Sequence, residues 1–463
     1  MRILAISAYF PPYSYGGYEI RVSNVMDALS ARGHEIHVLT TKTDTGMQAE
    51  RIAYAYPVLR VLNGASRKMR FSDRLTTHHL THGIGVVLVF LRETFADMRD
   101  LERVEREIRT FQPDLIYLGH IMPLSQELLP FLARQDLPLV ADEGGASLTF
   151  AFHGGGLWRR FLAEFPEGSI FQHLIKRSFV RVVSWLSHGR MQEERHWPAI
   201  HAFFNSELNA HNAHGAGVPL ARAEVIHSGI DTDFFSFKRP KAFGNPLTLL
   251  QPGRIEQNKG QLDAVELCAA LHARGIPCTL TIVGDRWKEI YAQEVENRIR
   301  ELGLNSSVRI LPMQSRSTLV KLYHQADICL FLSRYRSGFS RIPLEAMACG
   351  SLLLSYGNEG SDEILRDGEN GFIIPSGDIS TTAERISAFL REPELISRII
   401  HQARADIENE YSLSSYASKI EVFLEQVLQS KAIINQTEKN NRRRSTRVEL
   451  IWLHTNLQQE SLA

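Results

Sequence analysis

Short apolar runs alternate with helical patterns from the beginning of the chain. Residues 3–6 form an apolar run, and after a loop rich in proline, tyrosine and glycine the apolar positions from Tyr18 to Leu29 recur at helical spacing. Gly33 ends this pattern, and a second apolar run follows at residues 36–39. This order predicts a strand, a helix and a second strand parallel to the first.

Comparable runs occur in two series along the rest of the chain. Those of the first series lie at residues 115–118, 137–140 and 202–204. Those of the second lie at residues 247–250, 279–283, 308–311, 328–332 and 352–355, with helical patterns at 262–273, 287–302 and 317–325 between them. Apolar strands separated by helices are typical of parallel sheets covered on both faces. We therefore expect two doubly wound, Rossmann-like α/β domains whose carboxyl strand ends face a shared ligand cleft.

The composition agrees with a globular protein of more than one domain. The chain has 463 residues, of which 44% are hydrophobic and 22% charged. Its 52 basic and 52 acidic side chains give no general electrostatic reason to bind nucleic acid. Four cysteines without a C-x-x-C pair (Cys268, Cys278, Cys329 and Cys349) indicate reduced thiols in a cytoplasmic protein. No apolar run approaches the roughly 20 residues that span a bilayer.

Two segments do not follow the α/β pattern. Residues 158–197 are rich in aromatic and basic side chains, and residues 171–181 within them resemble an amphipathic helix. This helix is a candidate for peripheral contact with the inner face of the membrane or with a lipid-linked acceptor, and an ordinary core-facing helix is the alternative. The tail at 431–463 is basic around Arg443 and has little apolar periodicity, so we expect a mobile appendage.

The stretch from Ser333 to Gly350 carries the strongest chemical signal. It follows the predicted strand at 328–332, passes through a glycine-containing loop and enters a helix near Pro343, a residue suited to a first helical turn. A helix start offers free N–H groups and a positive potential to a phosphate. Glu345, in the first turns of this helix, has the two oxygens needed to accept both hydroxyls of a ribose. Together these features predict a nucleotide site.

The same stretch resembles the family 4 glycosyltransferases of the GT-B class, and the resemblance extends over residues 1–429. The family pattern is a glutamate, seven residues, a second glutamate and then Ala-Met-Ala-x-Gly. Glu345 matches the second glutamate, which the family uses on the nucleoside ribose, whereas Ser337 stands at the first. The resemblance implies retaining transfer of a sugar from a nucleotide-diphosphate sugar to a saccharide or lipid-linked saccharide acceptor, in cell-surface polysaccharide or glycolipid biosynthesis.

The resemblance also assigns donor-binding residues. Arg254 and Lys259, after the strand at 247–250, correspond to the cations that hold the donor diphosphate. Two fixed cations stabilise charge on a leaving oxygen without a metal, so we predict no cofactor; two solvated charges on a loop are the alternative. The other positions that the resemblance brings to the donor are Gly16, Gly17, Ser337, Gly338, Phe339, Ser340, Glu359 and Gly360.

Glu359 stands where the family usually has a glycine. The family carries a carboxylate at position 337 that contacts a donor-sugar hydroxyl, and Ser337 cannot make that contact as an anion. We therefore hypothesise that Glu359, or Arg336 and Arg341, take over part of the recognition of the donor sugar.

Other candidates lie at strand ends of the first domain. His120 follows the strand at 115–118, near where the family often carries a histidine facing the donor sugar, and it could bond a sugar hydroxyl or the acceptor oxygen. A structural histidine is the alternative. Asp142 and Glu143 are weaker candidates for acceptor binding, and a turn with solvated carboxylates is the alternative.

Two groupings invite comparison with metal sites. Asp231 and Asp233 lie in a turn before the interdomain linker, which favours a structural turn. His78, His79 and His82 have no suitably spaced carboxylate or thiol, which favours a solvated or interface cluster.

The expected domain boundaries follow from the strand series and the resemblance. Residues 1–235 form an N-terminal acceptor-side domain, 236–411 a nucleotide-sugar-binding domain, 412–430 a helix that packs back towards the first domain, and 431–463 the tail. Three other classes stay open. They are a non-catalytic or altered sugar-nucleotide-binding protein of the same fold, a sugar-nucleotide epimerase, and a nicotinamide dehydrogenase, although Gly16-Gly17 lack the third spaced glycine of the last.

Overall fold

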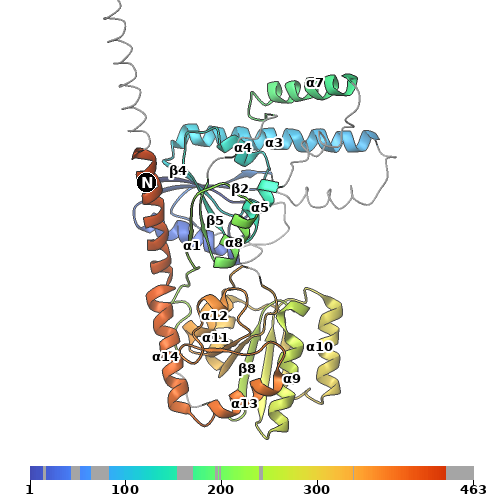
Figure 1. Cartoon of the computed structure of the whole chain (residues 1–463), viewed down its shortest axis with the longest axis vertical. Coiled ribbons are helices and arrows are strands. Elements are labelled where there is room, and N and C mark those ends of the chain that lie inside the picture. Colours follow the sequence, from blue (N-terminus) through green and yellow to red (C-terminus); the bar gives the residue numbers. More distant parts are fainter. Residues whose placement is uncertain are drawn as a thin grey trace, which may run out of the picture.

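The structure is a computed structural model of the chain and describes residues 1–13, 17–42, 53–63, 83–153, 170–192, 197, 200–238, 243–336 and 338–433. Within these ranges, residues 83–90, 170–173, 175 and 176 are described by their backbone alone. The described residues form two α/β domains that follow each other along the long axis of the molecule (Figure 1). The prediction of two doubly wound domains is confirmed.

In the described part of the first domain, seven parallel strands form a sheet in the order β3-β2-β1-β4-β5-β6-β7. The strands are β1 (Arg2–Ile6), β2 (Glu35–Thr41), β3 (Val58–Leu62), β4 (Leu115–Leu118), β5 (Leu139–Glu143), β6 (Ile200–Phe204) and β7 (Leu220–Val225). The helices are α1 (Gly17–Ala31), α3 (Gly83–Phe111), α4 (Leu128–Leu132), α5 (Ser147–His153), α7 (Ile170–Leu186) and α8 (Glu207–Gly215). The strand order reverses between β1 and β4, where open α/β sheets bind ligands at their carboxyl ends.

The second domain has a parallel sheet in the order β10-β9-β8-β11-β12-β13. The strands are β8 (Leu247–Pro252), β9 (Cys278–Val283), β10 (Val308–Leu311), β11 (Ile328–Phe331), β12 (Leu352–Ser355) and β13 (Phe372–Ile373). The helices are α9 (Gln261–Ala273), α10 (Glu289–Glu301), α11 (Arg316–Gln325), α12 (Ile342–Cys349), α13 (Ile379–Phe389) and α14 (Pro393–Glu410), with single 3₁₀ turns at Gln257–Lys259 and Ser361–Glu363. This order reverses between β8 and β11.

Helices cover both faces of each sheet, which explains the apolar runs of the central strands. Side chains alternate across a strand, so Leu4 and Ile6 enter one core of the first domain while Ile3 and Ala5 enter the other. The second sheet also lies between two apolar cores.

The edge strands β3, β7 and β13 are not predicted by the apolar runs. β7 alternates partly buried and exposed positions, and β3 is largely half-buried. An edge strand has one paired neighbour and can meet solvent, which accounts for the polar positions of β3 and β7. β13 is missed because it has two residues.

α3 and α7 lie on the outer side of the first domain, away from the second (Figure 1). α3 has 29 residues and α7 has 17. None of the described helices is both long and apolar enough to cross a membrane. Of the aromatic and basic segment at 158–197, the structure describes residues 170–192 and 197, which include α7.

Residues 413–433 form a further helix that runs alongside the first domain (Figure 1). Tyr416 and Phe423 are buried in the core that also contains side chains of β1 and α1. Glu421 lies 2.7 Å from both Arg32 and His34. The described part of the chain therefore returns to the first domain after it has built the second. The helix includes residues 431–433, which the sequence assigns to the tail, and 434–463 lie outside the described residues.

The packing of this helix yields a stability prediction. Phe423 is 1% exposed, whereas its neighbour Val422 is 50% exposed. Phe423→Ala should lower the free energy of unfolding of the first domain by about 3–5 kcal/mol, because truncating a buried aromatic ring leaves a cavity. Val422→Ala, the matched control, should change it by less than about 0.5 kcal/mol. Urea unfolding followed by circular dichroism measures both, and equal losses would contradict the observed packing.

Candidate functional site

Two loops of the second domain meet at the carboxyl ends of the neighbouring strands β8 and β11. The first loop carries residues 253–260, and the second leads into α12. The backbone N–H of Arg334 donates to the carbonyl of Asn258 at 2.8 Å. Gly260 has a φ of +70°, and a Cβ there would overlap the carbonyl oxygen of Leu332, so the approach requires glycine. The two loops are thus joined backbone to backbone near the start of α12.

Lys259 lies in the first of these loops and is paired with Glu359. Its Nζ is 2.5 and 2.7 Å from the two carboxylate oxygens, and the Lys259 and Glu359 side chains are 14% and 9% exposed. Arg254 is 52% exposed, lies 3.2 Å from Glu256 and stacks over the ring of Trp287 at 4.8 Å. The two cations assigned to a diphosphate therefore share a loop but differ in burial and partner.

Glu345 lies in the first turn of α12 and is mostly buried. The hydroxyl of Tyr323 donates to its carboxylate at 3.0 Å, and Nε of Arg341 lies 3.6 Å from it. Burial raises the pKa of Glu345, and Arg341 is the strongest of the groups that oppose this rise. Pro343 occupies the start of the helix, where its missing N–H costs no hydrogen bond.

The loop before α12 also contacts the turn that follows β12. The N–H of Ser340 donates to the carbonyl of Glu359 at 2.9 Å. Phe339 packs on Gly360, where a Cβ would lie 2.5 Å from the ring. Gly338 is two residues before Ser340 and has a φ of +63°. The structure thus brings these five predicted residues together, while Ser337 lies outside the described residues.

The first domain comes close to this region at two places, and a glycine lies at each of them. A Cβ on Gly17, at the start of α1, would lie 3.0 Å from Cδ of Arg341. A Cβ on Gly338 would lie 3.6 Å from the carbonyl oxygen of Gly144, which follows β5. The carboxyl ends of both sheets therefore face each other here. Gly16 lies outside the described residues.

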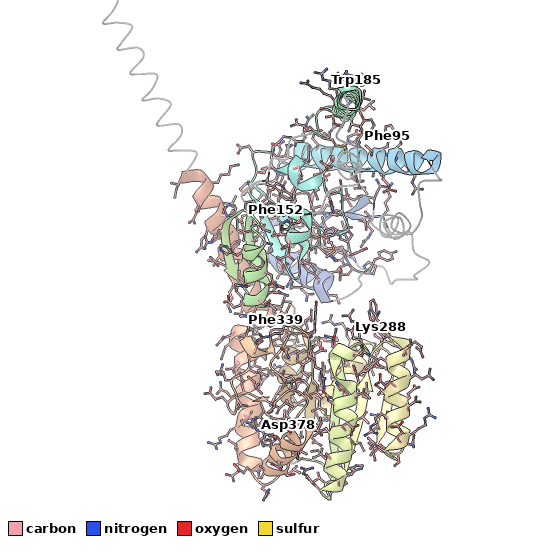
Figure 2. The ribbon with its side chains drawn as sticks, turned by 45° about the vertical axis from the view of Figure 1, so that its right-hand side comes forward. Phe95, Phe152, Trp185, Lys288, Phe339 and Asp378 are labelled. Carbon is pink, nitrogen blue, oxygen red and sulfur yellow. The ribbon has the colours of Figure 1, made fainter. Side chains whose placement is uncertain are left out.

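A carboxylate bridges the two domains beside this contact. Oε2 of Glu363, after β12, lies 2.7 Å from the ring Nε2 of His227 and accepts the N–H of Glu207 at 2.9 Å. The ring of His227 also lies 5.3 Å from that of Phe339. Figure 2 shows Phe339 at the level where the two domains meet.

His120 lies at the carboxyl end of β4, and neighbouring side chains hold its ring. Its Nδ1 is 3.1 Å from Oε1 of Glu19, and its ring stacks on Tyr18 at 5.1 Å. Glu19 is in the first turn of α1 and is 2% exposed. Glu19 and Tyr18 are not among the residues predicted from the sequence, although their place directly after the glycine pair is the available signal.

Asp142 and Glu143 are buried, so the expectation of solvated carboxylates is wrong. Asp142 accepts from Arg21 at 2.5 Å and from the hydroxyl of Tyr117 at 2.7 Å. Glu143 accepts the N–H groups of Gly145, Ser147 and Leu148 at the start of α5. Burial raises the pKa of Asp142, and Arg21 opposes the rise. Internal donors therefore already use both carboxylates.

The side chain of Asp231 accepts the N–H groups of Asp233 and Phe234, which confirms the predicted turn. His78, His79 and His82 lie outside the described residues.

The described residues bring together one group of possible metal ligands that the sequence did not suggest. Ligand atoms of Cys268, His272 and Cys278 lie within 4.8 Å of one another, and the two sulfurs are 3.2 Å apart. The thiol of Cys278 hydrogen-bonds Cys268, which lowers the pKa of Cys268. The His272 ring bonds the backbone of Cys278 at 3.0 Å, so these groups satisfy one another within the core.

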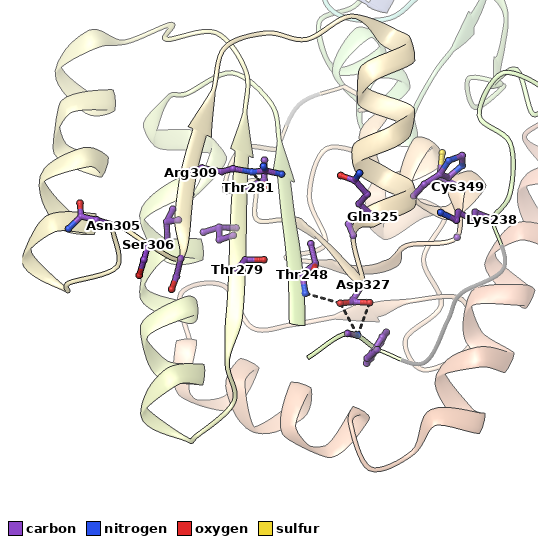
Figure 3. Close-up of a pocket in the computed structure, with 18 residues that line it drawn as sticks. Lys238, Thr248, Thr279, Thr281, Asn305, Ser306, Arg309, Gln325, Asp327 and Cys349 are labelled. Carbon is purple, nitrogen blue, oxygen red and sulfur yellow. Dashed lines mark hydrogen bonds between the residues drawn. The ribbon is translucent and has the colours of Figure 1, made fainter. Parts of the chain in front are cut away.

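A cavity of about 690 Å³ lies elsewhere in the second domain (Figure 3). Its wall includes Thr248, Thr279 and Asp327, which stand at the amino ends of β8, β9 and β11. The carboxylate of Asp327 accepts the N–H of Thr248 at 2.7 Å. The joined loops lie at the opposite ends of these strands, so this cavity is separate from the candidate site.

Two sequence models of known families cover most of the chain. The one described as Glycosyltransferase Family 4 matches residues 15–234, and the one described as Glycosyl transferases group 1 matches residues 233–406. The chain belongs to glycosyltransferase family 4.

Similar proteins and a solved structure extend this finding. The glycogen synthase of Mycobacterium tuberculosis is 24% identical over 427 residues, which cover 90% of this chain and 93% of that protein. A capsular polysaccharide biosynthesis glycosyltransferase of Staphylococcus aureus is 24% identical over 186 residues, 40% of this chain and 47% of that one. The crystal structure of Anabaena Alr3699/HepE in complex with UDP-glucose has a TM-score of 0.58 and 18% identity, covering 92% of this chain and 100% of that one. The shared fold is the GT-B arrangement.

The Arg21–Asp142 pair yields a second prediction for this family 4 chain. Both side chains are nearly inaccessible to solvent, so Arg21→Met leaves a buried carboxylate without its counter-ion and should cost about 3–5 kcal/mol of stability at pH 8. Without Arg21, burial alone holds the folded-state pKa of Asp142 above its ordinary value. The penalty therefore applies where the carboxyl is ionised and fades as the pH falls towards that pKa.

Urea unfolding at pH 8 and pH 5.5 tests this expectation. The double variant Arg21→Met/Asp142→Asn should recover part of the loss at pH 8, because it removes the charge. Arg32→Met, which breaks a more exposed pair with Glu421, is the control and should cost less than about 1 kcal/mol. A loss for Arg21→Met that is equal at both pH values contradicts the assignment.

Proposed function

We propose that this family 4 glycosyltransferase moves a sugar from a nucleotide-diphosphate sugar to a saccharide or lipid-linked saccharide acceptor with retention of configuration. The observation that carries the proposal is the backbone hydrogen bond between Arg334 and Asn258, which joins the loop of Lys259 to the loop that opens α12. Around it lie cations, a helix start and the carboxylate of Glu345, which are groups suited to a nucleoside diphosphate.

The comparisons support the donor class and the setting. Alr3699/HepE, whose fold is similar, was crystallised with UDP-glucose, and the relative from Staphylococcus aureus acts in capsular polysaccharide biosynthesis. We propose the same classes here: a sugar nucleotide as donor and cell-surface polysaccharide or glycolipid biosynthesis as the process.

Catalysis in this proposal rests on stabilising the departing diphosphate. Negative charge accumulates on the oxygen that separates from the anomeric carbon, and Arg254, Lys259 and the first N–H groups of α12 compensate it. Glu345 accepts the ribose hydroxyls and fixes the nucleoside. The departing diphosphate lies on the face that the acceptor attacks and takes up the acceptor proton, so the proposal requires neither a protein base nor a metal.

His120 would contribute from the first domain. Its ring, held by Glu19, can bond a sugar hydroxyl or the acceptor oxygen. The contact between the domains at Gly17 and Arg341 brings α1 close to this region. Closure of the domains would exclude water and protect the donor from hydrolysis.

The test begins with a thermal-shift screen of UDP, ADP, GDP and their glucose conjugates, followed by rates of sugar transfer and donor hydrolysis. Lys259→Ala should lower kcat/KM by about 10²–10³-fold, because it removes a mostly buried cation from the leaving group. Arg254→Ala should cost less, because solvent screens its half-exposed charge. Lys321→Ala, on the exposed side of α11, is the matched control and should leave the rate unchanged.

Donor binding without transfer or hydrolysis would identify a sugar-nucleotide-binding protein instead, in line with the serine at position 337. Equal losses in Lys259→Ala and Lys321→Ala would show that Lys259 does not act on the leaving group.

We further propose a cytoplasmic location with peripheral contact at the inner face of the membrane, made by α7. Leu174, Val182 and Trp185 are 59%, 51% and 76% exposed and recur on one face of this helix. Arg177 and Arg181 are exposed beside them, and α7 has no acidic residue. Figure 2 shows Trp185 at the outer end of the molecule, near Phe95 of α3. Exposed apolar and cationic side chains on one helix fit an anionic lipid surface.

Co-sedimentation with vesicles tests this contact. The protein should bind vesicles that contain phosphatidylglycerol more tightly than vesicles of phosphatidylcholine alone. Arg177→Ala/Arg181→Ala should weaken this binding by roughly 30-fold, since each arginine contributes about 1 kcal/mol near an anionic surface. Arg391→Ala/Arg398→Ala, which removes two exposed charges from the second domain, is the control. Binding that ignores lipid charge, or equal losses in both double variants, would contradict the proposal.

A further inference from the structure

We propose that Glu359 is a specificity residue that exchanges partners: it pairs with Lys259 before the donor binds and turns to the donor-sugar hydroxyls when the diphosphate engages Lys259. This inference rests on the proposed function and adds a means of telling the donor from the nucleoside diphosphate that remains after transfer.

The first observation is the backbone of Glu359. Its φ is +52°, in the left-handed region that glycine adopts freely and that a long side chain rarely enters. Gly357 and Gly360 nearby have φ values of +68° and +75°, so the turn contains three residues in this region, of which Glu359 alone carries a side chain. The N–H of Ser340 holds the Glu359 carbonyl at 2.9 Å. A strained glutamate in a turn suited to glycine points to a function for its side chain.

The second observation is the pairing itself. Both carboxylate oxygens of Glu359 lie within 2.7 Å of Nζ of Lys259, a residue 100 positions away in the sequence. The two side chains are 9% and 14% exposed, so solvent screens the pair only weakly. Glu359 is therefore paired with the same cation that the proposed function assigns to the diphosphate.

Charge and hydrogen bonding then dictate the exchange. A diphosphate on Lys259 competes with Glu359 for the same ammonium and repels its carboxylate. An ionised carboxylate is an acceptor only, so it needs donors elsewhere, and the hydroxyls of a sugar attached to the diphosphate supply them. A nucleoside diphosphate lacks the transferred sugar, and its ribose hydroxyls belong to Glu345 in the proposed function, which leaves Glu359 without a partner. Glu359 thus favours binding of the donor over binding of the nucleoside diphosphate product, and it assists release of that product.

Isothermal titration with two ligands on each variant tests the exchange. The two ligands are a nucleoside diphosphate and its glucose conjugate, for example UDP and UDP-glucose. The thermal-shift screen decides whether the uracil, adenine or guanine ligands are used. Glu359→Gln keeps the shape of the side chain and removes its charge, so it should tighten binding of the nucleoside diphosphate by about tenfold. It should leave binding of the sugar nucleotide unchanged or weaker, because the carboxylate no longer accepts the hydroxyls. Glu359→Gly, the residue that the family resemblance predicts, should shift the ratio of the two dissociation constants in the same direction.

Glu301→Gln is the matched control, since it removes a carboxylate from the exposed end of α10 in the same domain. In this variant the ratio of the two dissociation constants should equal that of the unaltered protein. Thermal unfolding without ligand checks that each variant is folded. If both ligands shift by one common factor in Glu359→Gln, or neither shifts, the exchange is wrong while the proposed function stands. If the unaltered protein binds none of the nucleotides or their glucose conjugates, the proposed function fails and the inference fails with it.

Discussion

The approach of the β8 loop to the β11 loop is the constraint on which the candidate site depends. The two strands are neighbours in a parallel sheet, so their loops leave the same edge side by side. Gly260 permits the contact, and the bond from Arg334 to Asn258 fixes it. Because this contact is made by the backbone, the side chains around it can differ without a change in its shape. This freedom explains how Ser337 and Glu359 stand where the family has other residues.

Sequence reasoning located the central strands and the loops that follow them. Continuous apolar runs mark strands buried on both faces, and the glycine and proline punctuation around Gly338 and Pro343 marks the loop and helix start. The edge strands β3 and β7 escape this reasoning because they are only partly buried, and β13 escapes it because it has two residues.

Partnerships between distant side chains could not be predicted in the same way. Glu19 meets His120, and Lys259 meets Glu359, only because parallel strands bring distant loops to one edge. The expectation for Asp142 failed for a related reason. Two adjacent acidic residues in a turn suggest solvated carboxylates. Arg21 of α1 supplies the buried cation that allows the Asp142 carboxylate to be buried. A single sequence shows each charge and not its counter-ion.

The chain crosses between the domains twice, and the two crossings are bonded to each other. The N–H of Ile230 donates to the carbonyl of Tyr411 at 2.8 Å, and the N–H of Leu413 donates to the carbonyl of Ile230 at 2.7 Å. Two independent tethers would let the domains slide as well as tilt. Because these bonds fasten the two crossings together, Ile230 and its partners form one connection between the domains, and the two crossings cannot move independently of each other.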